Sequence, residues 1–474
     1  FRSSTSVSLA CGLAKARDLK GGHENIIAVI GDGSLSGGEA YEGLSNAGEM
    51  GTNLIIVVND NEMSIAENHG GLYQNLKELR DTEGRSSCNF FRSLGLDYLY
   101  VGEGNDIPSL VAAFAKVKDT SRPTVVHIHT QKGKGYAPAE ADREEFHWEM
   151  PFDLETGKPK VDCSGMEDYH SLTGKFLLEK MKEDHTVVAI SSGTPTVIGF
   201  TPERRKQAGR QFVDVGIAEE HAVALASGIA AGGGRPVYGV YSTFIQRCYD
   251  QLSQDLCING NPAVITVFMG TVAGMNDVTH LGFFDIPLIS NIPNMVYLAP
   301  TCSEEYFAML EWAVRQTEYP VAIRVPGVAV VHRKEEFDTD YSELNRYKMT
   351  ARGETVAILA LGSFYDLGQA LKNKLREESG VEATLINPRY ITGLDEPMLE
   401  ELKVGHRIVV TLEDGVLDGG FGEKIARYYG NSEMRVLNYG LRKEFADRYN
   451  LDELMKTNRL TYKQMAEDIA GILE

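Results

Sequence analysis

Runs of apolar, largely β-branched residues recur along the chain and alternate with longer stretches of mixed character. In the first 150 residues, the runs 25–30, 53–58 and 124–130 have the length and composition of buried strands. Residues 6–18 and 35–50 carry apolar positions at helical spacing. This alternation predicts parallel sheets covered by helices, and hence the α/β fold class.

The same alternation continues to the C-terminus. The further predicted strands are 186–190, 211–215, 237–241, 264–269, 295–299, 321–325, 355–360, 382–387 and 407–411. A polar connector at 151–160 and a charged stretch at 333–340 interrupt the pattern. We therefore predict three doubly wound, mainly parallel-sheet domains, at residues 1–160, 161–340 and 341–474. The sequence begins at Phe1, without a methionine, within a segment that looks functional. We therefore expect the N-terminal part of the first domain to be absent.

Two polar residues follow neighbouring strands of the first domain. Asp32 lies in Gly31-Asp32-Gly33-Ser34, and Asn61 lies in Asn59-Asp60-Asn61-Glu62. A strand–helix–strand unit of this length is parallel and right-handed, so both residues are expected at the carboxyl edge of one sheet, where α/β folds bind ligands. A carboxylate and an amide oxygen suit Mg²⁺ shared with a diphosphate. Either turn alone would be unremarkable, but the pair favours the metal and diphosphate signature of thiamine-diphosphate enzymes.

The composition narrows the possible partners. The 474 residues are 43% hydrophobic and 24% charged, as in an ordinary folded protein. A formal net charge of −20 disfavours binding to nucleic acid or to an anionic membrane, so a phosphate group must be met by local cations or backbone amides. The cysteines are scattered without a Cys-x-x-Cys pair, which fits a reducing cytoplasm. Neither an apolar run long enough to span a membrane nor a secretory signal is visible in the sequence.

The second domain carries two segments that together fit a cofactor cleft. One places the acidic pair Glu219 and Glu220 just before the small-residue helix 222–231. Acidic residues are favoured in a first helical turn, so structure alone could explain this pair. In the other segment, 241–251, the residues Phe244, Arg247 and Gln251 fall at helical spacing and could share one face. An aromatic stripe of this kind is usually core, but two adjacent segments that end in polar groups fit a cleft better.

Several motifs make the resemblance specific. They are the segments 31–33, 59–65, 132–136, 217–223 and 241–247. In the residues, order and spacing of these motifs, the chain resembles the 1-deoxy-D-xylulose-5-phosphate synthase family over nearly its whole length, from Ser3 to the C-terminal block. Other transketolase-type enzymes share the metal signature but not this set of motifs.

The resemblance implies thiamine diphosphate and Mg²⁺ as cofactors. Asp32, Asn61 and the backbone carbonyl of Met63 would hold the metal. Phe244 would stack on the pyrimidine ring of the cofactor. The implied cofactor-binding residues are Ser4, Gly31, Asp32, Gly33, Ser34, Asn61, Met63, Ile65, Lys132, Glu219 and Phe244.

The resemblance also implies four catalytic residues. Glu219 would hydrogen-bond the aminopyrimidine ring and favour the tautomer that removes the thiazolium proton, because a carboxyl group can shift a proton along a short, desolvated hydrogen bond. Tyr241 and Arg247 would line the pocket beside Lys132 and meet the diphosphate or the substrate. His280 would hydrogen-bond the substrate or relay a proton at neutral pH.

The implied reaction adds pyruvate to the cofactor, releases CO₂ and condenses the remainder with glyceraldehyde 3-phosphate. Its product, 1-deoxy-D-xylulose 5-phosphate, feeds isoprenoid, thiamine and pyridoxal synthesis. The expected partners are therefore small molecules, pyruvate and an aldose phosphate, with no nucleic acid and no membrane. The resemblance further implies a cytoplasmic homodimer with each active site between the first two domains. Two alternatives stay open: a transketolase-like paralogue that uses another donor or acceptor, and a non-catalytic scaffold protein.

The substrate side departs from the family pattern. Met269 and Gly327 stand where arginines are expected, and Asn276 stands where an aspartate is expected. Those arginines would clamp the acceptor phosphate with a planar fork that Met and Gly cannot copy. Each hydrogen bond to a charged group is worth roughly 1.5–3 kcal/mol, so acceptor binding should weaken unless other cations substitute. The candidates for substitution are Arg333, Lys334 and Arg247.

Two further departures lie in loops. Arg2 stands where the family has an active-site histidine. The stretch between Asn68 and Phe91 is much shorter than the usual insertion at that point. Segments missing from the chain and natural shortening would both explain these differences, since loops of this kind are often mobile.

Overall fold

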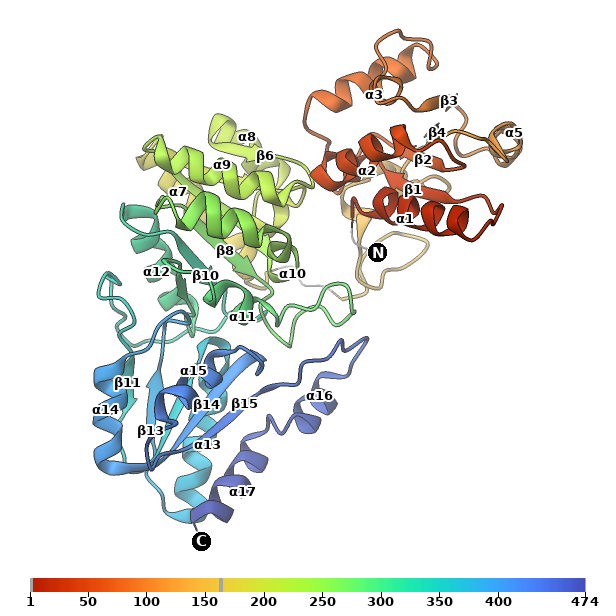
Figure 1. The fold of residues 1–474 in the computed structure, drawn as a ribbon. Helices are drawn as coiled ribbons and strands as arrows, with labels where there is room; N and C mark the ends of the chain where they lie inside the picture. The colour runs from red at the N-terminus through yellow and green to blue at the C-terminus, as the bar shows by residue number, and fades with distance from the viewer. Residues whose placement is uncertain (1–2, 162–164, 474) are drawn as a thin grey trace. The chain divides into compact units, whose positions relative to one another are not determined.

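The computed structural model describes residues 3–161 and 165–473. By its internal contacts the chain forms two compact units. Unit 1 comprises Phe1–Met166 together with the short segments Ser191–Pro195 and Asp214–Glu219, and unit 2 comprises the rest. Parallel strands and covering helices recur in both units, which confirms the predicted α/β fold class (Figure 1). The finer division into three domains stays a prediction.

Unit 1 is built on a four-stranded sheet in the order β1-β2-β4-β3. Its strands are β1 (Ile27–Gly31), β2 (Ile55–Asp60), β3 (Asp97–Val101) and β4 (Thr124–His129). All three pairings are parallel, as the strand–helix–strand pattern predicts. The three predicted strands of this region correspond to β1, β2 and β4, whereas β3 was not predicted.

Helices cover both faces of this sheet, but unequally. The longer helices are α1 (Ser6–Leu19), α2 (Gly38–Glu49), α3 (Gly71–Asp81) and α5 (Ile107–Val117), with short turns η1 (Gly33–Ser36), α4 (Phe90–Ser93), α6 (Ala137–Ala141) and η2 (Glu145–His147). Residues of α1 to α4 pack on one set of strand side chains. Residues of α5 pack on the alternate set, because successive side chains of a strand point to opposite faces.

The first sheet of unit 2 has six strands in the order β6-β5-β7-β8-β10-β9. The strands are β5 (Val187–Ser191), β6 (Phe212–Asp214), β7 (Arg235–Tyr241), β8 (Val264–Phe268), β9 (Val296–Leu298) and β10 (Val321–Arg324). The helical segments are α7 (Tyr169–Glu183), η3 (Pro195–Ile198), α8 (Pro202–Ala208), η4 (Gly209–Gln211), α9 (Glu219–Ala231), α10 (Ser242–Ile245), η5 (Gln246–Cys248), η6 (Gln251–Cys257), α11 (Asp285–Ser290) and α12 (Ser303–Arg315). Each strand matches a predicted strand within two residues.

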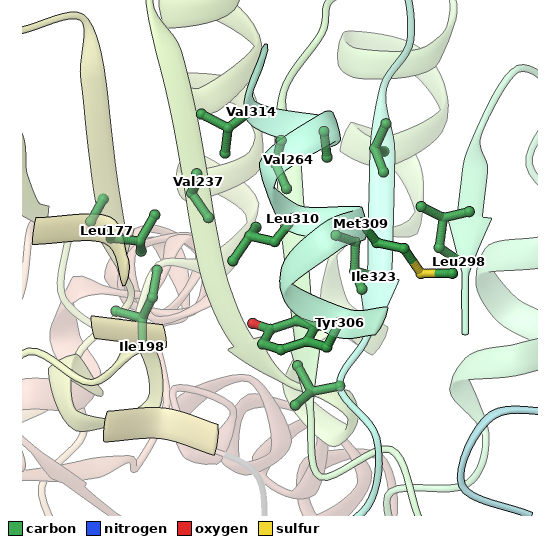
Figure 2. Packing of buried hydrophobic residues seen from close by; sticks show 14 of the residues in the cluster. Leu177, Ile198, Val237, Val264, Leu298, Tyr306, Met309, Leu310, Val314 and Ile323 are labelled. Atoms are coloured by element: carbon green, nitrogen blue, oxygen red, sulfur yellow. The ribbon is translucent and has the colours of Figure 1, made fainter. Parts of the chain in front are cut away.

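Helix α12 shows how this sheet is covered. Tyr306 and Leu310 of this helix belong to one buried cluster with the strand residues Val237, Val264 and Ile323, and the close view of the core shows them together (Figure 2). All five side chains are almost completely removed from solvent. Burial of this kind contributes roughly 1.5–3 kcal/mol for a large apolar side chain, so the helix layer stabilises the parallel sheet that it covers.

The second sheet of unit 2 has the order β11-β13-β12-β14-β15. The strands are β11 (Lys348–Ala351), β12 (Thr355–Ala360), β13 (Thr384–Asn387), β14 (His406–Val416) and β15 (Arg435–Leu441). The helical segments are η7 (Gly362–Phe364), α13 (Tyr365–Ser379), α14 (Glu396–Gly405), α15 (Phe421–Tyr429), α16 (Leu451–Thr457) and α17 (Tyr462–Leu473). Only the edge strand β11 runs antiparallel to its neighbour. The sequence predicted the central strands β12, β13 and β14 but neither edge strand.

The described residues bear on the state of the cysteines and on whether any helix could span a membrane. Cys11, Cys88, Cys248, Cys257 and Cys302 are all free thiols. Within the parts of the chain that the structure describes, every helix is too short or too polar to cross a bilayer.

Candidate active site

The carboxyl ends of β1 and β2 lie side by side in unit 1. In the strand register Gly31 pairs with Asn59, and the backbone N–H of Asp32 donates to the carbonyl of Asn59 over 3.1 Å. The two segments that were predicted to share a sheet edge therefore do so. Asp32 follows directly from β1, and Asn61 follows directly from β2.

Asp32 is a buried carboxyl group with only 1% of its surface exposed. The side-chain amide of Asn68 donates to its Oδ2 over 2.8 Å, and the hydroxyl of Tyr73 donates to its backbone carbonyl over 3.1 Å. Burial raises the pKa of Asp32 to about 7, and the nearby carboxylate of Asp60 adds to the rise. A carboxyl group held this way gains strongly from a cation, because a cation favours its charged form.

The other predicted cofactor residues of unit 1 gather around this edge. A Cβ on Gly33 would lie 2.8 Å from the side chain of Ser64, so the two strand-end loops touch. The Lys132 ammonium donates to the carbonyl of Ser64 over 2.6 Å and to that of Ile65 over 3.3 Å. Burial lowers the pKa of Lys132, and Asp32 partly offsets this by favouring the charged form. A positive charge therefore lies beside the loop that follows β2.

Hydrogen bonds between side chains and the backbone hold Asn61 and Ser4 in place at this edge. Oδ1 of Asn61 accepts from the backbone N–H of Met63 over 3.1 Å. The hydroxyl of Ser4, whose backbone has a left-handed φ of 74°, donates to the carbonyl of Ser34 over 2.7 Å. A Cβ on Gly37 would lie 2.3 Å from the Ser4 hydroxyl oxygen, so only glycine fits beside it. These contacts hold the N-terminal segment against the Asp32 loop.

A buried polar network below the edge was not recognised from the sequence. The carboxylate of Asp60 is fully buried, 2.5 Å from Nη1 of Arg80 and 2.9 Å from Nε2 of His127. The other ring nitrogen of His127 lies 2.7 Å from the hydroxyl of Tyr98. Burial alone would raise the pKa of Asp60, but the hydrogen bonds from His127 and Arg80 outweigh it and lower the pKa. Asp60 therefore stays charged beside Asp32.

The donor set of this edge fits a divalent ion on a diphosphate. Across the described residues, His, Cys, Asp and Glu side chains do not form any group of three or more that could hold a metal. A metal here would instead need the Asp32 carboxylate with amide, carbonyl and diphosphate oxygens, which is the hard oxygen set that Mg²⁺ prefers. Asn61 and Met63 offer oxygens of those two kinds directly after β2, and Lys132 offers a cation.

Glu219 begins helix α9 at the end of a segment that belongs to unit 1. Just before it, the backbone N–H of Ile217 donates to the hydroxyl of Ser36 over 2.8 Å. A Cβ on Gly216, whose φ is +73°, would lie 2.8 Å from the same hydroxyl. Because Ser36 ends the short helix η1 that follows Asp32, the segment just before Glu219 is tied to the loop that follows β1. The Glu219 residue itself is only 3% exposed, which suits a carboxyl group that handles a proton.

The other predicted catalytic residues gather in unit 2. The ring of Phe244 in α10 lies 5.7 Å from that of Tyr241 and 5.8 Å from the imidazole of His280, measured between centroids. Nε of Arg247 lies 3.4 Å from a carboxylate oxygen of Glu220, the residue after Glu219. The rings of Tyr241, Phe244 and His280 thus lie close together, and Arg247 lies beside Glu220. Their roles stay predictions.

A short local network orients His280. Its Nδ1 lies 3.0 Å from Oδ1 of Asp277 and 2.8 Å from the hydroxyl of Thr279. Burial would raise the pKa of Asp277, but its contacts with Thr279 and His280 lower it. An ionised Asp277 favours the tautomer with a proton on Nδ1, so Nε2 is left as the nitrogen that can accept a proton.

Two sequence expectations need comment. Residues 242–257 are helical throughout, but the helix type changes from α10 to the 3₁₀ turn η5 and then to the π-helical η6, so the shared face of Phe244 and Arg247 stays a prediction. The replacement cation Arg333 is engaged elsewhere: it lies 2.6 Å from Asp366 and over the ring of Tyr365. The position of Arg2 lies outside the described residues.

The chain matches three family models in the expected order. The model described as 1-deoxy-D-xylulose-5-phosphate synthase matches residues 2–89. The pyrimidine-binding domain of transketolase matches residues 167–330, and the C-terminal domain of transketolase matches residues 346–465.

Curated relatives extend the match to the whole chain. The 1-deoxy-D-xylulose-5-phosphate synthase of Clostridium beijerinckii is 35% identical over 100% of this chain and 81% of its own length. The enzyme of the same name from Lachnoclostridium phytofermentans is 36% identical over 90% of this chain and 73% of its own length.

Solved structures support the fold. A transketolase of Pichia stipitis in complex with sedoheptulose 7-phosphate has a TM-score of 0.52 and 15% identity, covering 99% of this chain and 80% of that chain. The transketolase of Campylobacter jejuni has a TM-score of 0.53 and 14% identity, covering 99% and 81%. At this identity the likeness concerns architecture, and it agrees with a transketolase-like α/β fold.

Proposed function

The chain belongs to the 1-deoxy-D-xylulose-5-phosphate synthase family, and we propose that it condenses pyruvate with glyceraldehyde 3-phosphate. The reaction releases CO₂ and gives 1-deoxy-D-xylulose 5-phosphate. It makes the protein a transferase of the transketolase type that uses thiamine diphosphate with a divalent metal. The observation that carries this proposal is the identity of about a third over the whole chain to enzymes of that name.

The cofactor would be held by the edge around Asp32 in unit 1. The carboxylate of Asp32, the amide oxygen of Asn61 and the carbonyl of Met63 would ligate Mg²⁺, which in turn holds the diphosphate. Lys132 would meet the diphosphate oxygens, and Ser4 would lie near them, since both residues lie at this edge. When bound, the cofactor supplies a carbanion nucleophile and an electron sink for decarboxylation.

The protein groups have separate tasks in this proposal. Glu219 would exchange a proton with the aminopyrimidine ring from a buried position, where a hydrogen bond is electrostatically strong. Phe244 would pack against that ring and fix its plane. His280, with Nε2 left free to accept by its contact with Asp277, would bind the substrate carbonyl or hydroxyl and move its proton.

The substrate side is where the paralogue alternative rests. Met269 and Gly327 replace the expected arginines, and Arg333 pairs with Asp366. The family relationship favours the synthase over a transketolase-like paralogue, and the missing guanidinium groups predict a weaker grip on the acceptor phosphate. The scaffold alternative has no supporting observation in the site.

The proposal also includes the identity of the metal, the assembly and the location of the protein. Magnesium is the divalent ion that the all-oxygen donor set suits best among common cellular ions. The assembly would be a homodimer, located in the cytoplasm. The product would supply isoprenoid and thiamine synthesis.

A two-donor assay tests the proposal. The protein is incubated with thiamine diphosphate, Mg²⁺ and glyceraldehyde 3-phosphate, with either pyruvate or a ketose phosphate as donor. We expect CO₂ and 1-deoxy-D-xylulose 5-phosphate in equal amounts from pyruvate. Robust turnover of the ketose donor without consumption of pyruvate would contradict the synthase assignment and support the paralogue.

The same assay can probe the acceptor site. The ratio of kcat/KM for glyceraldehyde 3-phosphate to that for unphosphorylated glyceraldehyde reports how much the phosphate contributes. Because Met269 and Gly327 cannot bind it, we expect a smaller ratio than a relative with both arginines shows. A ratio equal to that of such a relative would mean that other cations hold the phosphate.

A further inference from the structure

His280 lies in a loop that lacks regular secondary structure. This His280 loop, residues 270–284, runs from the end of β8 to the start of α11. On one side it contacts the segment that carries Phe244: the hydroxyl of Ser242 donates to the carbonyl of Gly282 over 2.8 Å, and that of Thr243 to the carbonyl of Thr279 over 3.2 Å. Loops longer than about 12–15 residues without secondary structure are uncommon in compact domains and are usually functional or disordered, so the contacts that order this loop are informative.

The C-terminal sheet supplies those contacts through Asp414. This residue lies in β14 and is 1% exposed. Its Oδ1 accepts from the backbone N–H of Val272 over 2.7 Å. Its Oδ2 accepts from the hydroxyl of Thr271 over 2.5 Å and from that of Ser363 over 2.7 Å. One buried carboxylate thus binds the first turn of the His280 loop.

A second C-terminal segment holds the middle of the loop. Residues 447–449 lie between β15 and α16. Oδ1 of Asp447 accepts from the N–H of Val278 over 3.0 Å, and the N–H of Arg448 donates to the carbonyl of Asn276 over 2.6 Å. The hydroxyl of Tyr449 donates to the carbonyl of Val272 over 2.7 Å. These bonds lie two to four residues from His280 and reach back to the turn that Asp414 binds.

Arg324 closes the far end of the loop. Its guanidinium binds both carboxylate oxygens of Asp285 at 2.8 and 3.1 Å and donates to the backbone carbonyl of Asp414 over 2.6 Å. Burial would lower the pKa of Arg324, but the contact with Asp285 outweighs it and raises the pKa, so the charge is kept. The first residue after the loop is thereby tied to the same strand.

We propose that Asp414 is a positioning residue for His280, through which the C-terminal sheet sets the geometry of the substrate pocket. The role follows from the contacts: the loop takes its hydrogen bonds from β14 and from residues 447–449 on one side, while His280 lies against Phe244 on the other. A buried carboxylate that accepts three hydrogen bonds holds its partners in one arrangement, because each unpaired donor would be costly. The proposal rests on the proposed function for the role of His280.

The test compares two neighbouring carboxylates on β14. Asp414→Ala removes the contacts to the His280 loop. Glu413→Ala is the matched control, because Glu413 is equally buried and accepts from the N–H groups of Phe421 and Gly422 instead. Asp414→Asn keeps an oxygen for the Val272 N–H and serves as the conservative rescue. The full-length protein is used throughout.

Two readouts separate positioning from stability. Hydrogen–deuterium exchange by mass spectrometry should rise over residues 270–284 in Asp414→Ala and over residues 420–425 in Glu413→Ala. In the assay with pyruvate and glyceraldehyde 3-phosphate, Asp414→Ala should lose about 10- to 100-fold in kcat/KM for glyceraldehyde 3-phosphate, because a misplaced catalytic group costs a factor of this order. Its affinity for thiamine diphosphate should stay unchanged, and Asp414→Asn should recover most of the loss.

Similar exchange and similar kinetics in the two alanine variants would overturn the proposal. The exchange pattern does not depend on which reaction the protein catalyses, so failure of the proposed function is distinguishable from failure of this inference. If Asp414→Ala does not fold, Tyr449→Phe takes its place, since it removes one hydroxyl contact to Val272. It should raise exchange over 270–284 with a smaller kinetic loss, and unchanged exchange would overturn the proposal.

Discussion

At the scale of single residues, Asp32 is the centre of the proposed cofactor site. Its carboxylate is buried between the amide of Asn68 and the carboxylate of Asp60, and its pKa of about 7 expresses the cost of that position. A divalent cation bound here would strongly stabilise the ionised form of this carboxyl group. Asp60, in contrast, is already paired with the guanidinium of Arg80, so we do not expect it to ligate the metal.

The raised pKa of Asp32 has a consequence for stability. Its folded value of about 7 exceeds the ordinary value of 3.8, so the folded state binds a proton that the unfolded state releases. In the absence of metal, the contribution of this group to stability falls as pH rises from about 4 to about 7. A bound cation requires the ionised form, so its stabilisation grows over the same window.

We therefore predict that Mg²⁺ with thiamine diphosphate raises Tm more at pH 8 than at pH 6. The measurement is differential scanning calorimetry at a fixed cofactor concentration. Asp32→Asn, which cannot ionise, should lose most of this pH dependence. Equal Tm shifts at both pH values in the unaltered protein would show that Asp32 does not ligate the cation.

A second residue-scale prediction concerns Glu219. Glu219→Gln should reduce turnover by about 100-fold or more, because proton transfer by a placed group contributes roughly 10²–10⁴-fold. Its cofactor affinity should stay within about an order of magnitude, since the amide preserves size and one hydrogen bond. Steady-state kinetics and cofactor titration measure the two quantities separately. Unchanged turnover would remove Glu219 from the mechanism.

At the scale of elements, the site depends on two strand-end loops that touch at Gly33. Gly33→Ala would place a methyl group 2.8 Å from the side chain of Ser64 and about as close to its backbone, and overpacking of this kind costs about 1–3 kcal/mol. Gly38→Ala is the matched control, because a Cβ there has open space at the start of α2.

We expect Gly33→Ala to lower both stability and cofactor affinity, while Gly38→Ala is neutral or stabilises by up to ~1 kcal/mol. Urea denaturation and cofactor titration of the two variants check this. If Gly33→Ala bound the cofactor as well as Gly38→Ala does, the contact between the loops would not matter for the site.

Helix α3 is tied to the sheet by the pair of Arg80 with Asp60. Arg80→Leu leaves a buried carboxylate without its cation and should cost about 3–5 kcal/mol. Lys77→Leu on the same helix breaks only the exposed pair with Asp81 and should cost about 0.3–0.5 kcal/mol. Because the pKa of Asp60 is lowered in the folded state, the penalty of Arg80→Leu should shrink as pH falls and Asp60 takes a proton. A pH-independent penalty in chemical denaturation would argue against this network.

At the scale of the whole molecule, buried parallel strands were the part that the sequence predicted well. β2, β7, β8 and β10 are short apolar runs in which almost every residue is buried, because both of their faces are covered. The strands that the pattern missed are β3, β11 and β15, which lie at sheet edges. Lys348 and Arg435 open two of them, and half-exposed edges do not need a continuous apolar run.

The site shows the same division. Asp32 and Asn61 could be found because they follow recognisable strands at a spacing that puts them on one edge. Asn68, Arg80 and His127 could not, because a partner in a buried network is chosen by three-dimensional proximity and leaves no local pattern. The tie between Asp414 and Val272 spans 142 positions, and only the folded chain reveals it.

In the proposed site, the edge formed by Asp32 and Asn61 holds a divalent cation and the diphosphate of thiamine diphosphate. Isothermal titration calorimetry of thiamine diphosphate into the unaltered protein, Asp32→Ala and Asn61→Ala, each with Mg²⁺ or with a chelator, tests it most directly. We expect tight binding by the unaltered protein that depends on Mg²⁺, and weak binding by both variants that Mg²⁺ no longer improves. Variants that hold the cofactor as tightly as the unaltered protein, or binding that ignores Mg²⁺, would contradict the account.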